Sequence, residues 1–183
     1  MYKIILILLI PFVSYGQDCN LIIAKDDFTK EEIKSGNAQA IYTVGLLNAQ
    51  YINIVLAKKG DQYIIGYQRK LLNSNKDDKQ FDITDDSKLL IRFENENVIE
   101  AKYNGKAQIA NLVWDNIFGT WAFNYEVEFI LPKAEFDKIP DSDALAIRVD
   151  NGVFPQDFDI KEKFKQTKPR KYLSTIANCL RLL

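Results

Sequence analysis

The alternation of residues 121–131 constrains the fold of this chain more than any other feature. In the segment WAFNYEVEFIL, every second residue from Trp121 to Leu131 is large and apolar, and the residues between are small, polar or acidic until Ile130. Successive side chains of a strand point to opposite faces, so this period predicts a long strand with one core face, which includes Trp121, and one wet face. Such a strand is typical of an antiparallel sheet. Pro132 ends it, because proline cannot donate to a strand ladder.

Similar β-prone segments follow one another along the chain, joined by short turns. Residues 50–57 and 62–68 predict one hairpin, and residues 89–93 and 98–103 predict a second. Further strands are expected at 40–44 and 144–149, with a brief pairing at 158–160.

Helical signals are confined to three places. Residues 29–34 predict a short helix between Thr29 and Gly36, with an irregular lead-in as the alternative, and residues 133–138 predict one helical turn. After Pro169, apolar residues recur at helical spacing up to Leu183, which predicts an amphipathic helix. The fold class expected is therefore mainly β: an antiparallel sandwich or partly rolled sheet built from hairpins, with a C-terminal amphipathic helix.

The first sixteen residues have the layout of a secretory signal peptide. Lys3 precedes the apolar run IILILLI at 4–10, Pro11 breaks the run, and Ser14 and Gly16 place small residues before a cleavage site. We therefore expect residues 1–16 to be the signal peptide and residues 17–183 to be a single β-rich domain without a transmembrane span. Acylation of Cys19 is disfavoured, because Asp18 precedes it. With no obvious C-terminal sorting domain, the periplasm is favoured over the cell surface or secretion.

The chain has two cysteines, Cys19 and Cys179, one near each end of the expected mature domain. Export to an oxidising compartment favours one disulfide between them over two independent thiols. Chain termini often lie close together at a domain surface, which agrees with such a pairing.

The sequence contains no histidine, which removes several classes of site at once. Ser-His-Asp and Cys-His catalysis, and zinc or copper held by histidine, are excluded. The chain has 24 Lys and Arg residues and 25 Asp and Glu residues. Loss of Lys3 with the signal peptide leaves a net charge of about −2. Nucleic acid is therefore not expected as a partner. No cofactor and no metal are expected.

The order of several segments carries a resemblance. Tyr15-Gly16-Gln17 spans the end of the signal peptide and the first residue after it, and Asp27-Phe28-Thr29 follows. The later segments are LLI at 89–91, VI at 98–99, KAEFDKI at 133–139, AIRV at 146–149 and DFDI at 157–160 before the terminal helix. The pattern resembles a loose set of uncharacterised exported proteins common in Bacteroidota, over most of residues 17–183. The resemblance implies a periplasmic or cell-surface β-rich domain and brings no established activity and no catalytic residues.

Acidic residues offer two candidate sites, each weighed against plain solvation. The acidic pairs 77–78, 85–86, 141/143 and 157/159 could supply oxygen ligands to Ca²⁺, yet none matches a calcium-binding loop motif. Glu126 and Glu128 share one strand face at a spacing compatible with two-carboxylate glycoside hydrolysis. For the acidic pairs, the favoured interpretation is that loops between strands carry acids for turn formation and solubility. For Glu126 and Glu128, it is solvation of the wet sheet face. Arg148, flanked by Ile147 and Val149, could pair with a glutamate of the sheet face such as Glu126 or Glu128, which would be a structural role.

The segment QIANLVWDNIFGT at 108–120 is unusually apolar for a connection between strands. Exposed, it would mark a contact with a partner, with Trp114, Ile117 and Phe118 as the binding residues. A buried strand or short helix filling the core is the favoured alternative for this segment.

The leading functional hypothesis is a non-enzymatic envelope domain that binds a protein partner through Trp114, Ile117 and Phe118. Two alternatives remain open: a carboxylate-based glycan-active enzyme, and a carrier of a small ligand or lipid that would need an apolar cavity.

Overall fold

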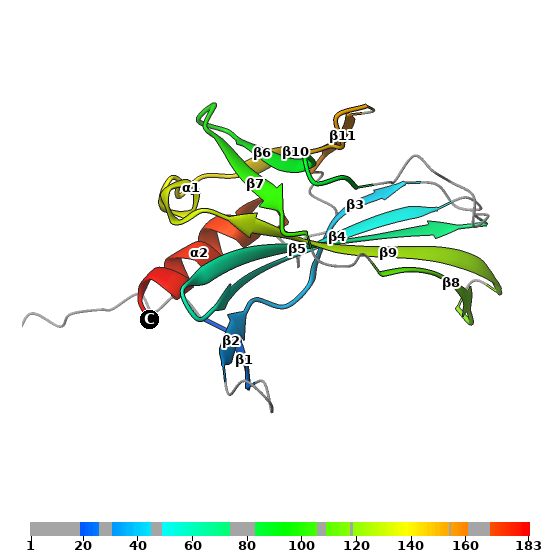
Figure 1. Ribbon diagram of the computed structural model, residues 1–183, viewed down its shortest axis with the longest axis horizontal. Helices are drawn as coiled ribbons and strands as arrows, with labels where there is room; N and C mark the ends of the chain where they lie inside the picture. The colour runs from blue at the N-terminus through cyan, green and yellow to red at the C-terminus, as the bar shows by residue number, and fades with distance from the viewer. Residues whose placement is uncertain are drawn as a thin grey trace, which may run out of the picture.

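The computed structural model describes residues 19–25, 31–44, 49–73, 83–105, 109–117, 119–153, 155–160 and 169–183. Within these residues, eleven strands form one sheet, and its pairings are antiparallel (Figure 1). The predicted signal peptide lies outside the described residues. The strands are β1 (Ile22–Lys25), β2 (Glu32–Ser35), β3 (Gln39–Val44), β4 (Gln50–Lys59), β5 (Gln62–Leu72), β6 (Lys88–Phe93), β7 (Val98–Tyr103), β8 (Ile109–Asp115), β9 (Thr120–Leu131), β10 (Ala144–Asp150) and β11 (Gln156–Asp159). The helical elements are α1 (Lys133–Asp137), the 3₁₀ turn η2 (Pro169–Lys171) and α2 (Tyr172–Arg181).

Three long strands, β4, β5 and β9, form the middle of the sheet. The sheet order is β1-β2-β4-β5-β9-β7-β6-β10-β11, and β3 and β8 lie off this path. Strand β4 is long enough to pair with β3 along residues 50–54 and with β2 along residues 57–59. In the same way, β9 pairs with β8 along residues 120–126 and with β7 at 129–130. Strands β4 and β9 therefore each pair with two different strands along one edge.

The core lies on one face of these long strands, as the alternation at 121–131 predicts. In β9, the odd-numbered residues from Phe123 to Leu131 are buried in one apolar cluster with the inward residues of β4 and β5. Trp121 was expected on this core face, but half of its side chain is exposed. It stands near the end of β9 where the β8–β9 hairpin continues beyond the core, so this residue-level prediction is wrong.

One end of the sheet, at β11, folds back over β3 and β5, which makes the sheet partly rolled. Figure 1 shows β6, β7, β10 and β11 lying over the long strands. On β11, the Phe158 ring packs edge-on against Tyr42 of β3 at 5.3 Å between centroids. Next to it, the buried Arg69 of β5 donates to the Gln156 side chain of β11 and lies over the Phe158 ring. The predicted fold class is confirmed: a mainly β, partly rolled antiparallel sheet with a C-terminal helix.

Helix α2 closes the side of the roll between β4 and β10, both of which it contacts. Its buried stripe includes Leu173, Ile176 and Leu180. Close packing against Gly36 is part of the fit, because a Cβ at that position would lie 2.7 Å from the Tyr172 hydroxyl. That hydroxyl accepts a hydrogen bond from the Leu56 backbone N–H at 3.2 Å.

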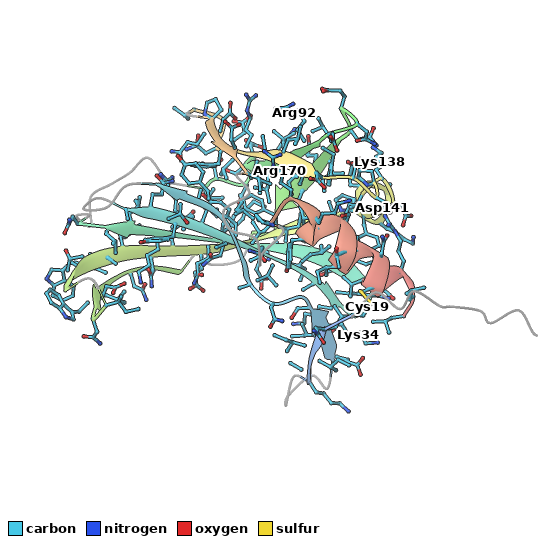
Figure 2. The ribbon with its side chains drawn as sticks, turned by 180° about the vertical axis from the view of Figure 1, so that it is seen from behind. Cys19, Lys34, Arg92, Lys138, Asp141 and Arg170 are labelled. Carbon is cyan, nitrogen blue, oxygen red and sulfur yellow. A yellow bond between two sulfur atoms is a disulfide. The ribbon has the colours of Figure 1, made fainter. Side chains whose placement is uncertain are left out.

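The two cysteines are paired as predicted. The Sγ atoms of Cys19 and Cys179 lie 2.09 Å apart, at disulfide distance, and their Cα atoms are 5.6 Å apart. Figure 2 shows Cys19 beside α2, whose buried face carries Cys179. The bridge therefore fastens the residues before β1 to the terminal helix.

The predicted helix at 29–34 is wrong where the structure describes the segment. Residues Glu32–Ser35 form β2, which pairs with β1 on one side and with the end of β4 on the other. The local helix propensity of Glu31-Glu32-Ile33-Lys34 is overridden by these ladder hydrogen bonds. Thr29, the expected cap, lies outside the described residues. No helix among the described residues is long and apolar enough to cross a membrane.

Candidate functional site

The segment singled out at 108–120 forms most of a hairpin, in which β8 pairs with β9 from Ile109–Glu126 to Asp115–Thr120. A short loop joins the strands. The Asp115 carboxylate accepts a hydrogen bond from the Ile117 N–H at 2.8 Å, and the Asp115 carbonyl accepts one from the Gly119 N–H at 2.8 Å. Gly119 has a φ of +61°, a conformation that glycine adopts without strain. These hydrogen bonds and the conformation of Gly119 fix the backbone on either side of the turn.

The tip of this hairpin is apolar. Trp114 and Trp121 are 51% and 50% exposed, and Ile117 is 87% exposed. The two indoles face each other across the strands in a T-shaped contact, with centroids 5.5 Å apart. We call Trp114, Ile117 and Trp121 the apolar tip. Of the predicted binding residues, Trp114 and Ile117 belong to it, and Phe118 lies outside the described residues.

Where it is described, the segment is a strand and a turn that extend past the core, as Figure 1 shows for the free end of β8 and β9. Trp114 and Ile117 are exposed, whereas Leu112 and Val113 are partly buried against apolar clusters. The segment is therefore a strand, as one alternative expected, but a partly exposed one. The sequence pattern marked the apolar residues but assigned Trp121 to the core, so only part of the apolar tip was foreseen.

A polar hollow of about 320 Å³ lies beside the tip on the outer face of the sheet. Its lining comes from four neighbouring strands and from Ile117 in the turn: Tyr51, Asn53, Gln68, Lys70, Asp115, Ile117 and Asn124. Lys70 forms an ion pair with Asp115, whose side chain is only 3% exposed. This pair ties the hairpin to β5 and compensates the burial of the carboxylate.

Amide side chains form a ladder across the same face. Asn53 donates to Gln68 at 2.9 Å, and Gln68 donates to Glu126 at 2.7 Å. The Asn124 side-chain oxygen is buried and accepts no hydrogen bond from any residue that the structure describes. Sequence reasoning missed this hollow. The available signal was the polar residues at outward positions, such as Asn53 on β4, Gln68 on β5 and Asn124 on β9, but only the strand order places them side by side.

The carboxylates proposed for glycoside hydrolysis have ordinary structural partners. Glu126 accepts the bond from Gln68, and Glu128 accepts one from Asn104 at 3.0 Å. Arg148 pairs with neither of them. It donates to both oxygens of Asp157 on β11, at 2.6 and 2.7 Å, so that prediction is wrong. Strand β10 lies beside β11 and far from β9 in the sheet order, which no local pattern could reveal.

The acidic pairs weighed as calcium ligands do not converge where they can be seen. Within the described residues, no group of three or more Asp, Glu, Cys or His side chains could hold a metal ion. The Arg148 guanidinium holds the pKa of Asp157 below its usual range, mainly through their hydrogen bonds. Asp143 forms an ion pair with Lys171 at 3.7 Å. The pair at 77–78 lies outside the described residues.

The geometry provides an apolar tip on a projecting hairpin and a polar hollow beside it. Comparisons of the chain with protein-family models, with curated proteins and with solved structures find no match.

Proposed function

We propose that this chain is an exported, non-enzymatic domain of the cell envelope, placed in the periplasm, and that it binds a protein partner through the β8–β9 hairpin. The observation that carries the proposal is that Trp114, Ile117 and Trp121 are each exposed at the free end of the β8–β9 hairpin. Tryptophan is a preferred anchor of protein interfaces, and apolar groups gathered on a soluble surface mark contact sites.

The free edge of β8 supports the same surface. Among the described residues, β8 pairs with β9 alone. Exposed edge strands are commonly protected by lysine, by proline or by a bulge. The stretch IANLVW at 109–114 contains no charged residue and no proline. A partner strand added to this edge would satisfy its backbone groups, and the apolar tip would anchor it.

Support for a binding role also comes from residue types. The sequence has no histidine to act as a general base at neutral pH. Glu126 and Glu128 accept hydrogen bonds from the amide groups of Gln68 on β5 and of Asn104, which directly follows β7. The signal-peptide layout and the Cys19–Cys179 pair support export to an oxidising compartment.

A photo-crosslinking experiment tests the proposal in the cells that produce the chain. A photoreactive amino acid replaces Ile117 in one variant and Val153, which is 68% exposed at a distant turn, in the matched control. We expect one predominant envelope protein to be crosslinked at position 117 and not at position 153. Identical products at both positions, or none at 117, would contradict the proposal.

The purified domain and the crosslinked protein can then be used to measure the binding affinity. We expect Trp114→Ala/Ile117→Ala to weaken binding of the identified protein at least about tenfold, because truncation of one interface anchor commonly costs more than about 1 kcal/mol. Val153→Ala should leave the affinity unchanged. Calorimetry or surface plasmon resonance measures both, and an unaltered affinity in the double variant would remove the apolar tip from the interface.

A further inference from the structure

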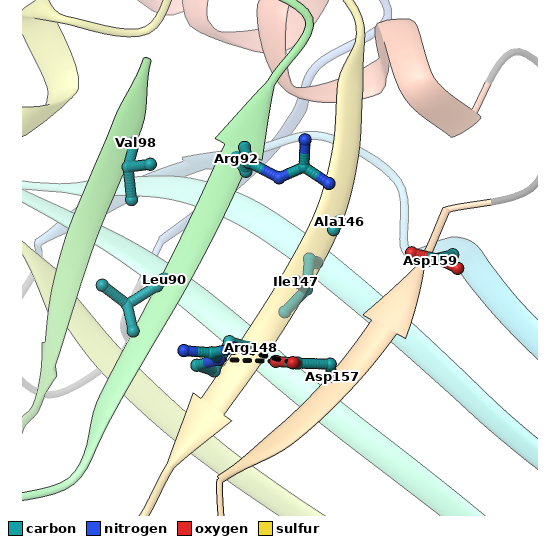
Figure 3. A pocket seen from close by; sticks show the side chains of 8 residues that line it. All are labelled: Leu90, Arg92, Val98, Ala146, Ile147, Arg148, Asp157 and Asp159. Atoms are coloured by element: carbon teal, nitrogen blue, oxygen red, sulfur yellow. Dashed lines mark hydrogen bonds and ion pairs between the residues drawn. The ribbon is translucent and has the colours of Figure 1, made fainter. Parts of the chain in front are cut away.

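A second hollow, of about 310 Å³, lies on the outer face of β6, β10 and β11. The strand register explains how it forms. Ala146 of β10 stands directly between Arg92 of β6 and Asp159 of β11. Because alanine has only a methyl group, the longer side chains on either side leave a hollow above it. Figure 3 shows Arg92 leaning towards Ala146 from one side, with Asp159 on the other.

Among the described residues, only some of the charges around this hollow are paired. Arg148 and Asp157 form the bidentate ion pair described above. They lie two residues along their strands from Ala146 and Asp159. Arg92 and Asp159 differ from this pair. Within the part of the chain that the structure describes, neither the Arg92 guanidinium nor the Asp159 carboxylate has a hydrogen bond or ion pair. Opposite charges therefore face the same hollow without meeting.

The separation of the two charges is set by the sheet. Neighbouring strands are about 4.8 Å apart, so the backbones of Arg92 and Asp159, two strands apart, are separated by about 10 Å. A ligand with an anionic and a cationic group a few bonds apart fits between them. The planar guanidinium of an arginine can bind a carboxylate through two parallel hydrogen bonds, and an aspartate carboxylate accepts hydrogen bonds from an ammonium group.

The rest of the lining is apolar. Leu90 and Val98 line the hollow beside Arg92, and Val98 is 45% exposed. Ligand pockets range from about 300 to 1,000 Å³, so this hollow is suited to a small molecule. An aliphatic group attached to the charged part would rest on Leu90 and Val98.

We propose that the hollow over Ala146 binds a free α-amino acid with an aliphatic side chain, with its carboxylate on Arg92 and its ammonium group on Asp159. Both protein charges are exposed, so each contact contributes little and the affinity is in the millimolar range. This site is separate from the apolar tip and does not depend on the proposed partner.

Three related ligands test the two charge contacts. L-leucine carries both charges, N-acetyl-L-leucine lacks the ammonium group, and L-leucinamide lacks the carboxylate. Titrations of the disulfide-bonded domain, followed by two-dimensional NMR of backbone amides, should show saturable shifts around Ala146 with L-leucine. Each of the other two ligands should bind about two- to fivefold more weakly, which is the effect of losing one exposed charge contact. Equal binding of all three, or shifts that do not centre on Ala146, would overturn the proposal.

Variants assign each charge to its residue. Arg92→Gln should abolish the preference for L-leucine over L-leucinamide, and Asp159→Asn should abolish the preference over N-acetyl-L-leucine. Both positions are exposed, and the NMR spectrum itself reports whether the fold is kept. Lys102→Gln, on the same face but outside the hollow, is the matched control. A preference that survives removal of its assigned charge, or an equal effect of the control, would refute the assignment.

Discussion

At the residue scale, Tyr172 couples the terminal helix to the sheet and makes stability depend on alkaline pH. Burial raises the pKa of the Tyr172 phenol to about 12, and the hydrogen bond from Leu56 offsets only part of that effect. Its usual pKa is about 10, so the unfolded chain loses this proton first as the pH rises. The neutral phenol therefore contributes stability fully below about pH 10, and this contribution is lost as the pH rises to about 12.

We predict that the effect of Tyr172→Phe on the free energy of unfolding changes sign with pH. Near pH 8 the variant should be less stable by about 1 kcal/mol, because the Leu56 N–H loses its acceptor. Between about pH 10 and 12, the wild-type free energy of unfolding should fall by of order 2 kcal/mol more than that of the variant. Urea unfolding across this range measures the difference. A difference between the two proteins that stays constant with pH would contradict the prediction. Burial also raises the pKa of Tyr67, but that residue is present in both proteins.

At the element scale, the β8–β9 hairpin depends on its turn. Alanine at Gly119 would meet no heavy atom within 4 Å, so its only penalty comes from the backbone φ of +61°. We predict that Gly119→Ala costs about 1–2 kcal/mol locally, and that Gly119→Asn costs less, because asparagine tolerates this conformation. Hydrogen exchange should accelerate at Val113 and Ala122, whose amides lie in the β8–β9 ladder, and stay unchanged at Ile65 in the core. Equal acceleration at all three amides would mean that the hairpin does not open separately.

There is a physical reason why the predictions of some elements were confirmed and others were wrong. The hairpins at 50–68 and 89–103 were predictable, because their alternation and their turns are local signals and the structure contains both. The segment at 32–35 was not, since its strand state depends on pairing with β4. Likewise, the polar hollow depends on which strands are neighbours. Trp114 and Ile117 could be selected from the sequence, whereas Arg92 and Asp159 could not, because β10 brings them together.

At the scale of the whole molecule, contacts between distant segments close the roll. Tyr42 meets Phe158, and the buried Arg69 donates to Gln156, so β11 is held over β3 and β5. These pairs are far apart in the sequence, and nothing in their local pattern indicates them. A sandwich and a rolled sheet therefore remained equivalent expectations until the strand order was known. The same reasoning applies to Arg148, whose partner is on the next strand in space, β11.

The disulfide is the contact with the longest reach, since Cys19 and Cys179 are separated by 160 positions. In the loop-entropy account, a bridge of this span restricts almost the whole unfolded chain and contributes up to about 5 kcal/mol. We predict that Cys19→Ser/Cys179→Ala lowers the free energy of unfolding by a large part of that amount. Alanine is chosen at position 179 because the side chain there is buried against the sheet, where a hydroxyl would need a partner.

Urea unfolding can separate an effect on the unfolded chain from a loss of native contacts. An unfolded chain without the bridge is more expanded and exposes more surface, so the dependence of the unfolding free energy on urea should become steeper in the variant. Chemical reduction of the wild type should reproduce both changes. Cys19 is exposed and precedes β1, so the native packing of α2 should persist, and the exchange rates of the buried amides of β5 and β9 should keep their rank order. If the urea midpoint and the urea dependence of the variant were unchanged, the bridge would contribute nothing to stability. The noncovalent packing of α2 would then hold the ends of the domain together by itself.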